Sequence, residues 1–198
     1  IVGFDDYLTL TKLINDRGIK NVLELGTGIG ASAAVMALSG ARVITVEQYE
    51  KCVQIAKDLI PENLQKNIEF YREDVEVINS LPYQCFERFK KLPKGDFDLI
   101  VIDGPGPFED ANGFVVDLPG GDFIELLGTT KKGTLFYIDG RKPMVKLIFR
   151  FFSRYFEVLE NTQSVTLLSR TDYIGKFEDG TIGVYDLLRN KFKEQGYL

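Results

Sequence analysis

Acidic side chains lie at or near the ends of four strand-like segments, and they are the residues of this chain most able to do chemistry. Glu24 belongs to the first segment, Glu47 closes the second, Asp74 follows the third and Asp103 closes the fourth. Because parallel strands bring their carboxyl ends to one edge of a sheet, these carboxylates should line the edge where open α/β sheets bind ligands. A single acid at such a position can simply cap a helix. Four in succession predict a binding site.

A glycine-rich turn follows the first of these segments. It runs Glu24-Leu25-Gly26-Thr27-Gly28-Ile29-Gly30-Ala31-Ser32. Glycine lets the backbone turn tightly and approach a ligand without a Cβ in the way, and the helix that follows offers unpaired N–H groups to an anionic group. The spacing also satisfies the dinucleotide fingerprint. The turn alone therefore leaves open a nicotinamide cofactor, and also a tight turn that binds nothing.

The elements that must position these residues alternate between strand and helix. Strands are predicted at 20–25, 42–46, 67–71, 97–103 and 134–139, and helices at 31–39, 50–60, 75–91 (with a break at Pro82), 123–131 and 143–155. Two further strands at 156–160 and 164–169 predict an antiparallel hairpin. The pattern indicates one α/β domain over residues 1–198, a Rossmann-like three-layer sandwich. Its sheet is mostly parallel and seven-stranded, with an antiparallel C-terminal hairpin strand.

Composition excludes several functions. The 198 residues contain no histidine, which rules out a Ser-His-Asp triad, a histidine base and a histidine-bound metal within this chain. The net charge of −5 argues against a nucleic-acid partner, and no apolar run is long enough to span a membrane. Two cysteines without CxxC spacing predict reduced thiols and a cytoplasmic location.

The ordered motifs VLELGTGIGAS, RVITVEQ, EFYREDV and FDLIVIDGPG resemble those of class I S-adenosylmethionine-dependent methyltransferases. The resemblance covers residues 21–139 and is nearest to the catechol O-methyltransferase-like branch. It implies S-adenosylmethionine as the cofactor. Its implied contacts are Gly26, Thr27, Gly28 and Gly30 for the methionine part, Ser32 for the carboxylate, Glu47 for the ribose, Asp74 for the adenine amino group and Asp103 near the methyl, with Glu24 and Gln48 beside them.

Two alternatives remain at this point. One is an NAD(P)-binding oxidoreductase, which is the weaker because Glu24 stands where a dehydrogenase strand is usually apolar, and because acids after the third and fourth strands have no role in the dinucleotide fingerprint. The other is a protein that binds S-adenosylmethionine without catalysis.

Asp103 and Asp139 are the candidate catalytic residues for methyl transfer to the acceptor. In the branch that the chain resembles, two aspartates and an asparagine hold a divalent metal, and Gly140 stands here in place of the asparagine. No lysine follows Asp103 to act as a base. Mg²⁺ could bind two carboxylates and waters, or one aspartate could act directly as the general base, or Asp139 could only cap a turn.

The acceptor itself is predicted only by class. Asp103-Gly104-Pro105 resembles a signature of methyltransferases that act on sugar or uronate hydroxyls, so a small-molecule or sugar hydroxyl is expected. Arg141 and Lys142 could attract an acidic substrate, although a solvated helix face explains the basic residues at 142–154 equally well.

Three segments carry further expectations. Residues 104–121 are rich in glycine and proline and predict a lid over the site. The tail, residues 171–198, could cover the site or pair with a second copy, so a homodimer is possible. The chain begins at Ile1 with no signal-peptide pattern, and acceptor-binding helices ahead of Ile1 are left open.

Overall fold

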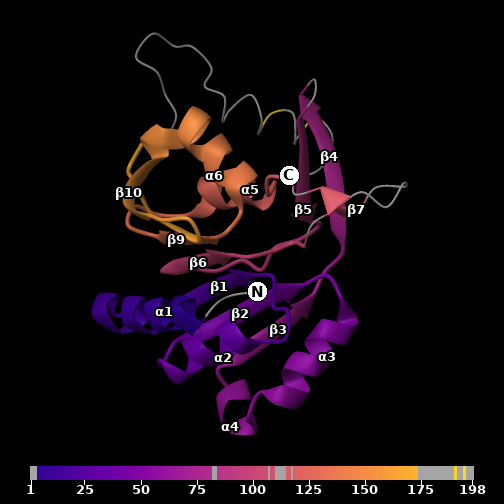
Figure 1. Cartoon of the computed structure of the whole chain (residues 1–198), viewed down its shortest axis with the longest axis vertical. Coiled ribbons are helices and arrows are strands. Elements are labelled where there is room, and N and C mark those ends of the chain that lie inside the picture. Colours follow the sequence, from indigo (N-terminus) through magenta and orange to yellow (C-terminus); the bar gives the residue numbers. More distant parts are fainter. Residues whose placement is uncertain are drawn as a thin grey trace.

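A seven-stranded sheet forms the centre of the computed structural model, which describes residues 4–81, 84–106, 108–109, 115–116, 118–173, 190 and 194. The strands are β1 (Asn21–Leu25), β2 (Arg42–Glu47), β3 (Ile68–Arg72), β6 (Leu99–Ile102), β9 (Leu135–Asp139), β10 (Phe156–Asn161) and β11 (Val165–Arg170), in the order β10-β11-β9-β6-β1-β2-β3. β11 runs antiparallel to both β9 and β10, and the other pairings are parallel. The predicted fold class is confirmed (Figure 1).

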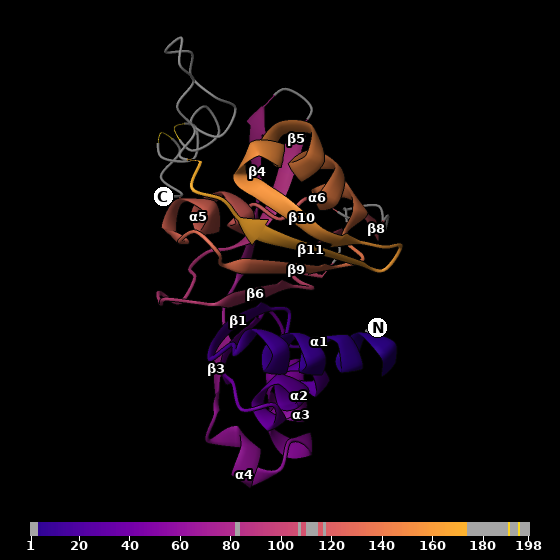
Figure 2. The ribbon, with the colours of Figure 1, turned by 90° about the vertical axis from the view of Figure 1, so that its left-hand side faces the viewer.

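Helices cover both faces of the sheet. The strands are apolar on both sides, as expected for a buried parallel sheet: Val22 and Val101 face one layer, whereas Leu23 and Ile102 face the other. The helices of the first layer are α1 (Phe4–Arg17), α2 (Ala31–Leu38) and α3 (Glu50–Leu59), with the short α4 (Glu62–Gln65) after them; those of the second are α5 (Asp122–Thr129) and α6 (Lys142–Leu147) (Figures 1 and 2). None of the helices in the described part of the chain has the length and hydrophobicity to cross a bilayer.

α1 was not predicted from the sequence, and it matters for the site. Leu10 and Ile14, four residues apart, are buried against the sheet beside Tyr137, which anchors the helix by one apolar stripe. Its first turns then carry Asp6 and Tyr7 toward the carboxyl edge of the sheet, where Asp6 contributes to the raised pKa of Asp139 and Tyr7 lies near Asp103 and Glu24.

The predicted helix at 75–91 is wrong. The segment is an antiparallel hairpin of β4 (Val75–Leu81) and β5 (Gln84–Phe89), which packs beside α5 on the second face. Cross-strand pairs stabilise the hairpin: Ile78 and Phe86 pair and are fully buried, and Glu76 pairs with Arg88, whose Nε lies 3.7 Å from a carboxylate oxygen of Glu76. Asp122 secures the hairpin to α5, because its carboxylate accepts a hydrogen bond from the Phe89 N–H.

The other elements follow the prediction with local changes. The helix expected at 143–155 is α6 followed by a π-helical turn, η1 (Ile148–Phe152), and a short 3-10 helix, η2 (Ser153–Tyr155). Within 104–121, β7 (Phe108–Glu109) pairs with β8 (Val115–Val116). Residues 107, 110–114 and 117 of the predicted lid, and the tail beyond 173 apart from residues 190 and 194, lie outside the described residues.

Candidate active site

The buried end of the site is a hydrogen-bonded network around Glu24, which is fully buried in β1. Ser32 from α2 donates to one carboxylate oxygen, and Thr45 from β2 donates to the other at 2.6 Å. Thr45 and Thr27 share a further hydrogen bond of 2.6 Å. Burial raises the pKa of Glu24 to about 7 against the lowering effect of these hydroxyls. The network fixes the glycine-rich turn to two neighbouring strands.

Glu47 at the end of β2 is held in a fixed orientation by backbone donors. One carboxylate oxygen accepts from the Gly28 N–H at 2.9 Å, and the other accepts from the N–H groups of Gln48 and Tyr49 at 2.8 and 3.0 Å. The side chain is only 6% exposed. The oxygen that accepts from Gly28 retains an acceptor site for a further donor such as a hydroxyl group, whereas the other oxygen already accepts two N–H groups.

A cavity of about 340 Å³ lies over the glycine-rich turn. Its lining residues come from α1, the turn, the start of α2 and the end of β6: Tyr7, Thr27, Gly28, Ile29, Ala31, Ser32 and Asp103. Three of the predicted cofactor residues besides Asp103 thus meet here. Gln48 is consistent with a ligand at this edge, because its side-chain oxygen is buried without a hydrogen-bond partner among the described residues.

Asp103 and Asp139 lie at the ends of the neighbouring strands β6 and β9, close enough for the charge of Asp103 to contribute to the raised pKa of Asp139. Asp103 is exposed and Asp139 is half-buried. Burial raises the pKa of Asp139 to about 6, helped by the negative charges of Asp103 and Asp6. Partial desolvation of its carboxylate also raises the pKa of Asp103, and Arg141 opposes this rise. A carboxylate with a pKa near 6 can accept a proton at neutral pH.

Asp74 stands apart from this group. It follows β3 as expected, but its exposed carboxylate is paired with Arg72 and with Lys90 at 3.2 Å, and both cations lower its pKa. It does not line the cavity. Contact between Asp74 and an adenine ring therefore stays a prediction, and it requires the carboxylate to exchange an ion pair.

Two tyrosines near the carboxylates were missed. Tyr7 lines the cavity, and burial together with Asp103 and Glu24 raises its pKa. Tyr137 lies two residues before Asp139 on the same side of β9, and its hydroxyl is buried with no hydrogen-bond partner among the described residues. The signal that could have found Tyr7 is the Leu10–Ile14 spacing, which predicts a helix covering the sheet.

The donor set does not fit the metal site of the branch that the sequence resembles. Gly140 offers no side chain beside Asp139, and the described residues contain no group of three or more carboxylate, thiol or imidazole side chains placed to hold an ion. Asp103 and Asp139 therefore stand as two carboxylates without the third side-chain ligand of that site.

Arg141 does not face a substrate site. It is buried, and its guanidinium donates to the carbonyl oxygens of Pro105 and Leu118, the latter at 2.9 Å. One side chain thus holds both ends of the segment between these residues. This geometry argues against the expectation that Arg141 attracts an acidic substrate, because both terminal nitrogens of its guanidinium donate to backbone carbonyls.

Comparison with known proteins agrees with this geometry. A model of the O-methyltransferase family matches residues 2–107, which is more than half of the chain. The chain belongs to the O-methyltransferase family. The matched part holds α1, the glycine-rich turn, Glu47 and Asp103, and it ends before Asp139.

Individual relatives are more distant. The chain is 28% identical, over 134 residues, to a protein-L-isoaspartate O-methyltransferase from Dictyoglomus thermophilum, a match that covers 65% of this chain and 57% of that protein. The chain thus spans little more than half the length of that curated relative.

Two solved structures show the same fold. They are the O-methyltransferase TomG from Streptomyces achromogenes, in complex with SAM (TM-score 0.60, 16% identity, 86% of this chain and 82% of that one), and an O-methyltransferase from Bacillus cereus, in complex with SAH (TM-score 0.55, 20% identity, 86% and 83%).

Proposed function

We propose that this chain is an S-adenosylmethionine-dependent O-methyltransferase that transfers a methyl group to a hydroxyl of a small molecule or sugar. The observation that carries the proposal is the cavity between the glycine-rich turn and Asp103, with the carboxylate of Glu47 held in place beneath it by the Gly28 N–H. Family membership supports the reaction class, and the SAM and SAH bound to neighbours of the same fold support the cofactor.

The residues at the cavity suit such a cofactor. When bound, S-adenosylmethionine supplies an electrophilic methyl group on a positively charged sulfur. Glu47 would accept the ribose hydroxyls, and the buried oxygen of Gln48 offers an acceptor beside it. Gly26, Thr27, Gly28, Gly30 and Ser32 would contact the methionine part. The carboxylates of Glu47 and Asp103 give the cavity a negative field, which favours a cationic sulfur centre.

Asp139 is the group that we assign to proton removal. On methylation of an acceptor hydroxyl, the hydroxyl proton would pass to a carboxylate oxygen of Asp139, while the bound cofactor would supply the methyl group and retain the electron pair of the bond that breaks. The raised pKa of Asp139 makes it a stronger base than an ordinary aspartate. The negative charge of Asp103 contributes to this raised pKa. Alignment of the acceptor hydroxyl with the methyl group would supply the remaining rate acceleration.

Calorimetry tests the cofactor assignment. We expect S-adenosylhomocysteine to bind, and Glu47→Ala to weaken it about tenfold or more, because a charged hydrogen bond contributes roughly 1.5–3 kcal/mol. Lys66→Gln, on an exposed lysine after α4, is the control and should bind as the wild type does. Binding of NAD without any response to S-adenosylhomocysteine would reject the proposal in favour of an oxidoreductase.

An acceptor screen tests catalysis. Catechols, hydroxycinnamates, sugars and uronates are offered with radiolabelled S-adenosylmethionine, and at least one hydroxyl class should become methylated. Tight cofactor binding with no turnover on any acceptor would instead favour the non-catalytic binding protein.

A further inference from the structure

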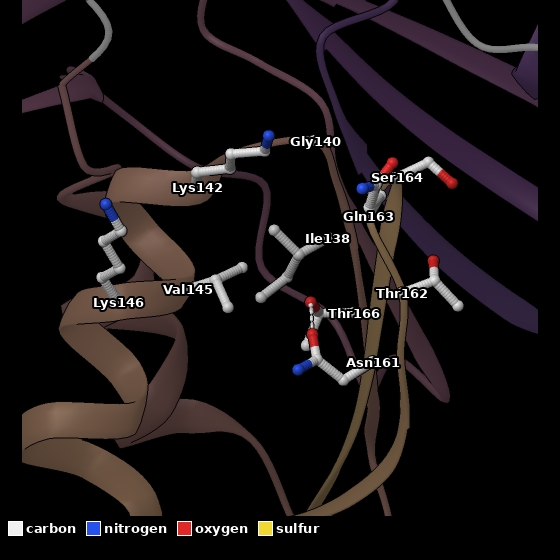
Figure 3. Close-up of a pocket in the computed structure, with 10 residues that line it drawn as sticks. All are labelled: Ile138, Gly140, Lys142, Val145, Lys146, Asn161, Thr162, Gln163, Ser164 and Thr166. Atoms are coloured by element: carbon white, nitrogen blue, oxygen red, sulfur yellow. Dashed lines mark hydrogen bonds between the residues drawn. The ribbon is translucent and has the colours of Figure 1, made fainter.

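A second cavity, of about 190 Å³, lies at the same edge of the sheet but against the opposite face (Figure 3). It is bounded by α6 on one side and by the turn between β10 and β11 on the other. Ile138, which lines it, faces the layer of α5 and α6, whereas Tyr137 faces α1. The two cavities share no lining residue.

The second cavity combines an apolar floor with a cationic rim. Figure 3 shows Ile138 and Val145 pointing into the space between α6 and the hairpin. Lys142 and Lys146 stand one helical turn apart on α6 at its rim, and both are exposed. Neither ammonium group forms an ion pair with a described residue. Both are therefore available to an anion.

Polar donors face the lysines from the hairpin. The side-chain oxygen of Asn161 already accepts a hydrogen bond from Thr166 at 2.9 Å. Its amide nitrogen, which points toward α6 in Figure 3, is left to donate outward. The backbone oxygen of Ser164 is likewise occupied, since it accepts from the Gly140 N–H at 2.6 Å. The Asn161 amide nitrogen thus adds a neutral donor opposite the two lysines, as an oxyanion requires.

Gly140 connects this cavity with the catalytic aspartates. It lines the second cavity and directly follows Asp139. A Cβ built on Gly140 would meet no atom within 4 Å, so the space over this residue is open. Gly140 therefore presents no side-chain barrier of its own between this cavity and the adjacent Asp139.

We propose that this cavity binds an anionic group, a carboxylate or phosphate ester, carried by the methyl acceptor. The proposal rests on the proposed function, since it assigns a substrate class to the same enzyme. The volume is below the roughly 300–1,000 Å³ of pockets that hold whole drug-sized ligands. The cavity therefore fits one part of an acceptor whose hydroxyl reaches Asp139. Its two lysines would favour an acceptor that carries an anionic group over a neutral acceptor of similar shape.

Direct binding tests the site without knowledge of the acceptor. Inorganic phosphate and benzoate are titrated, at constant ionic strength, into the ¹⁵N-labelled full chain. We expect the amide signals of Gly140, Ser164 and the Asn161 side chain to shift. The shifts should be lost in the double variant Lys142→Gln/Lys146→Gln and kept in Lys66→Gln. Equal shifts in the double variant, or shifts spread over all exposed lysines, would overturn the assignment.

Kinetics on matched acceptor pairs test the link to the substrate. For glucuronate against glucose, or caffeate against catechol, the double variant should raise KM for the anionic member about tenfold or more, with kcat and the neutral member unchanged. Phosphate should compete with the anionic acceptor. Inhibition that is not competitive would assign the cavity to a free anionic effector and overturn the proposal.

Failure of this inference can be told from failure of the proposed function. Loss of S-adenosylhomocysteine binding in the calorimetry rejects the methyltransferase itself. Normal cofactor binding and turnover, combined with no anion-dependent shift and no change in KM, rejects only the anionic subsite.

Discussion

Gly26 and Gly104 meet backbone against backbone. A Cβ on Gly26 would stand 2.7 Å from the Gly104 nitrogen, and one on Gly104 would stand 2.6 Å from the Gly26 Cα. The N–H groups of Asp103 and Gly104 both donate to the Leu25 carbonyl, at 3.0 and 2.6 Å. The turn that bounds the proposed cofactor cavity and the strand end that carries Asp103 are therefore placed by one close contact.

This contact predicts the effect of a single methyl group. Gly26→Ala should weaken S-adenosylhomocysteine binding, because the turn and Asp103 must separate, and lower the free energy of unfolding by about 1–3 kcal/mol. Gly40→Ala is the matched control: Gly40 has a similar positive φ, 90° against 96°, but a Cβ there meets nothing within 4 Å. It should lose some stability to backbone strain and keep its cofactor affinity. Equal affinity losses in both variants would contradict the role of the contact.

The pair Asp103 and Asp139 predicts a pH profile. If Asp139 removes the acceptor proton, the rate should rise with pH and level off above about 6, where Asp139 becomes ionised. Asp139→Asn should lower kcat roughly 10²–10⁴-fold and leave S-adenosylhomocysteine binding intact.

Chelation distinguishes proton removal by Asp139 from catalysis by a metal that Asp139 binds. EDTA should leave the rate unchanged, because Gly140 supplies no third ligand beside Asp103 and Asp139 and the described residues form no metal site. A rate that collapses on chelation and returns with Mg²⁺ would move Asp139 from base to ligand.

The buried Glu24 predicts a pH-dependent stability. Its pKa is raised on folding from 4.5 to about 7, so the folded state holds the proton more tightly than the unfolded state. The stabilisation is fully present below pH 4.5 and is lost as pH rises toward 7, and the pKa difference corresponds to roughly 3 kcal/mol. Urea unfolding at several pH values should show this decline in the wild type. Glu24→Gln, which cannot titrate, should show a smaller decline, and parallel curves would mean that Glu24 keeps its ordinary pKa.

Sequence patterns predicted the sheet because its strands are short, β-branched and closed by acids or glycines, and these signals are local. The hairpin β4–β5 was mistaken for a helix because the ion pairs that stabilise it join residues distant in sequence. Arg88 pairs with Glu76 across the two strands and with Glu125 of α5.

The roles of Tyr7 and Arg141 escaped prediction for a similar reason. Tyr7 reaches the cavity only because Leu10 and Ile14 seat α1 on the sheet. In the sequence Arg141 is typical of a cation that attracts a substrate, but in the structure its guanidinium donates to the carbonyl oxygens of Pro105 and Leu118. Residue type predicted the acids of the site, whereas tertiary packing decides which cations are free to act.

Arg141 and Lys142, adjacent in sequence, should therefore fail in different ways. Arg141→Lys keeps the charge but cannot donate to two carbonyls in the fork geometry of a guanidinium. Because each charged hydrogen bond contributes roughly 1.5–3 kcal/mol, this variant should unfold at lower urea concentration while keeping the phosphate-dependent shift at Gly140. Lys142→Gln should unfold as the wild type does and weaken that shift. Urea titration and phosphate titration of both variants give a crossed comparison. A stable Arg141→Lys protein that has lost phosphate binding would show that Arg141, and not Lys142, receives the anion.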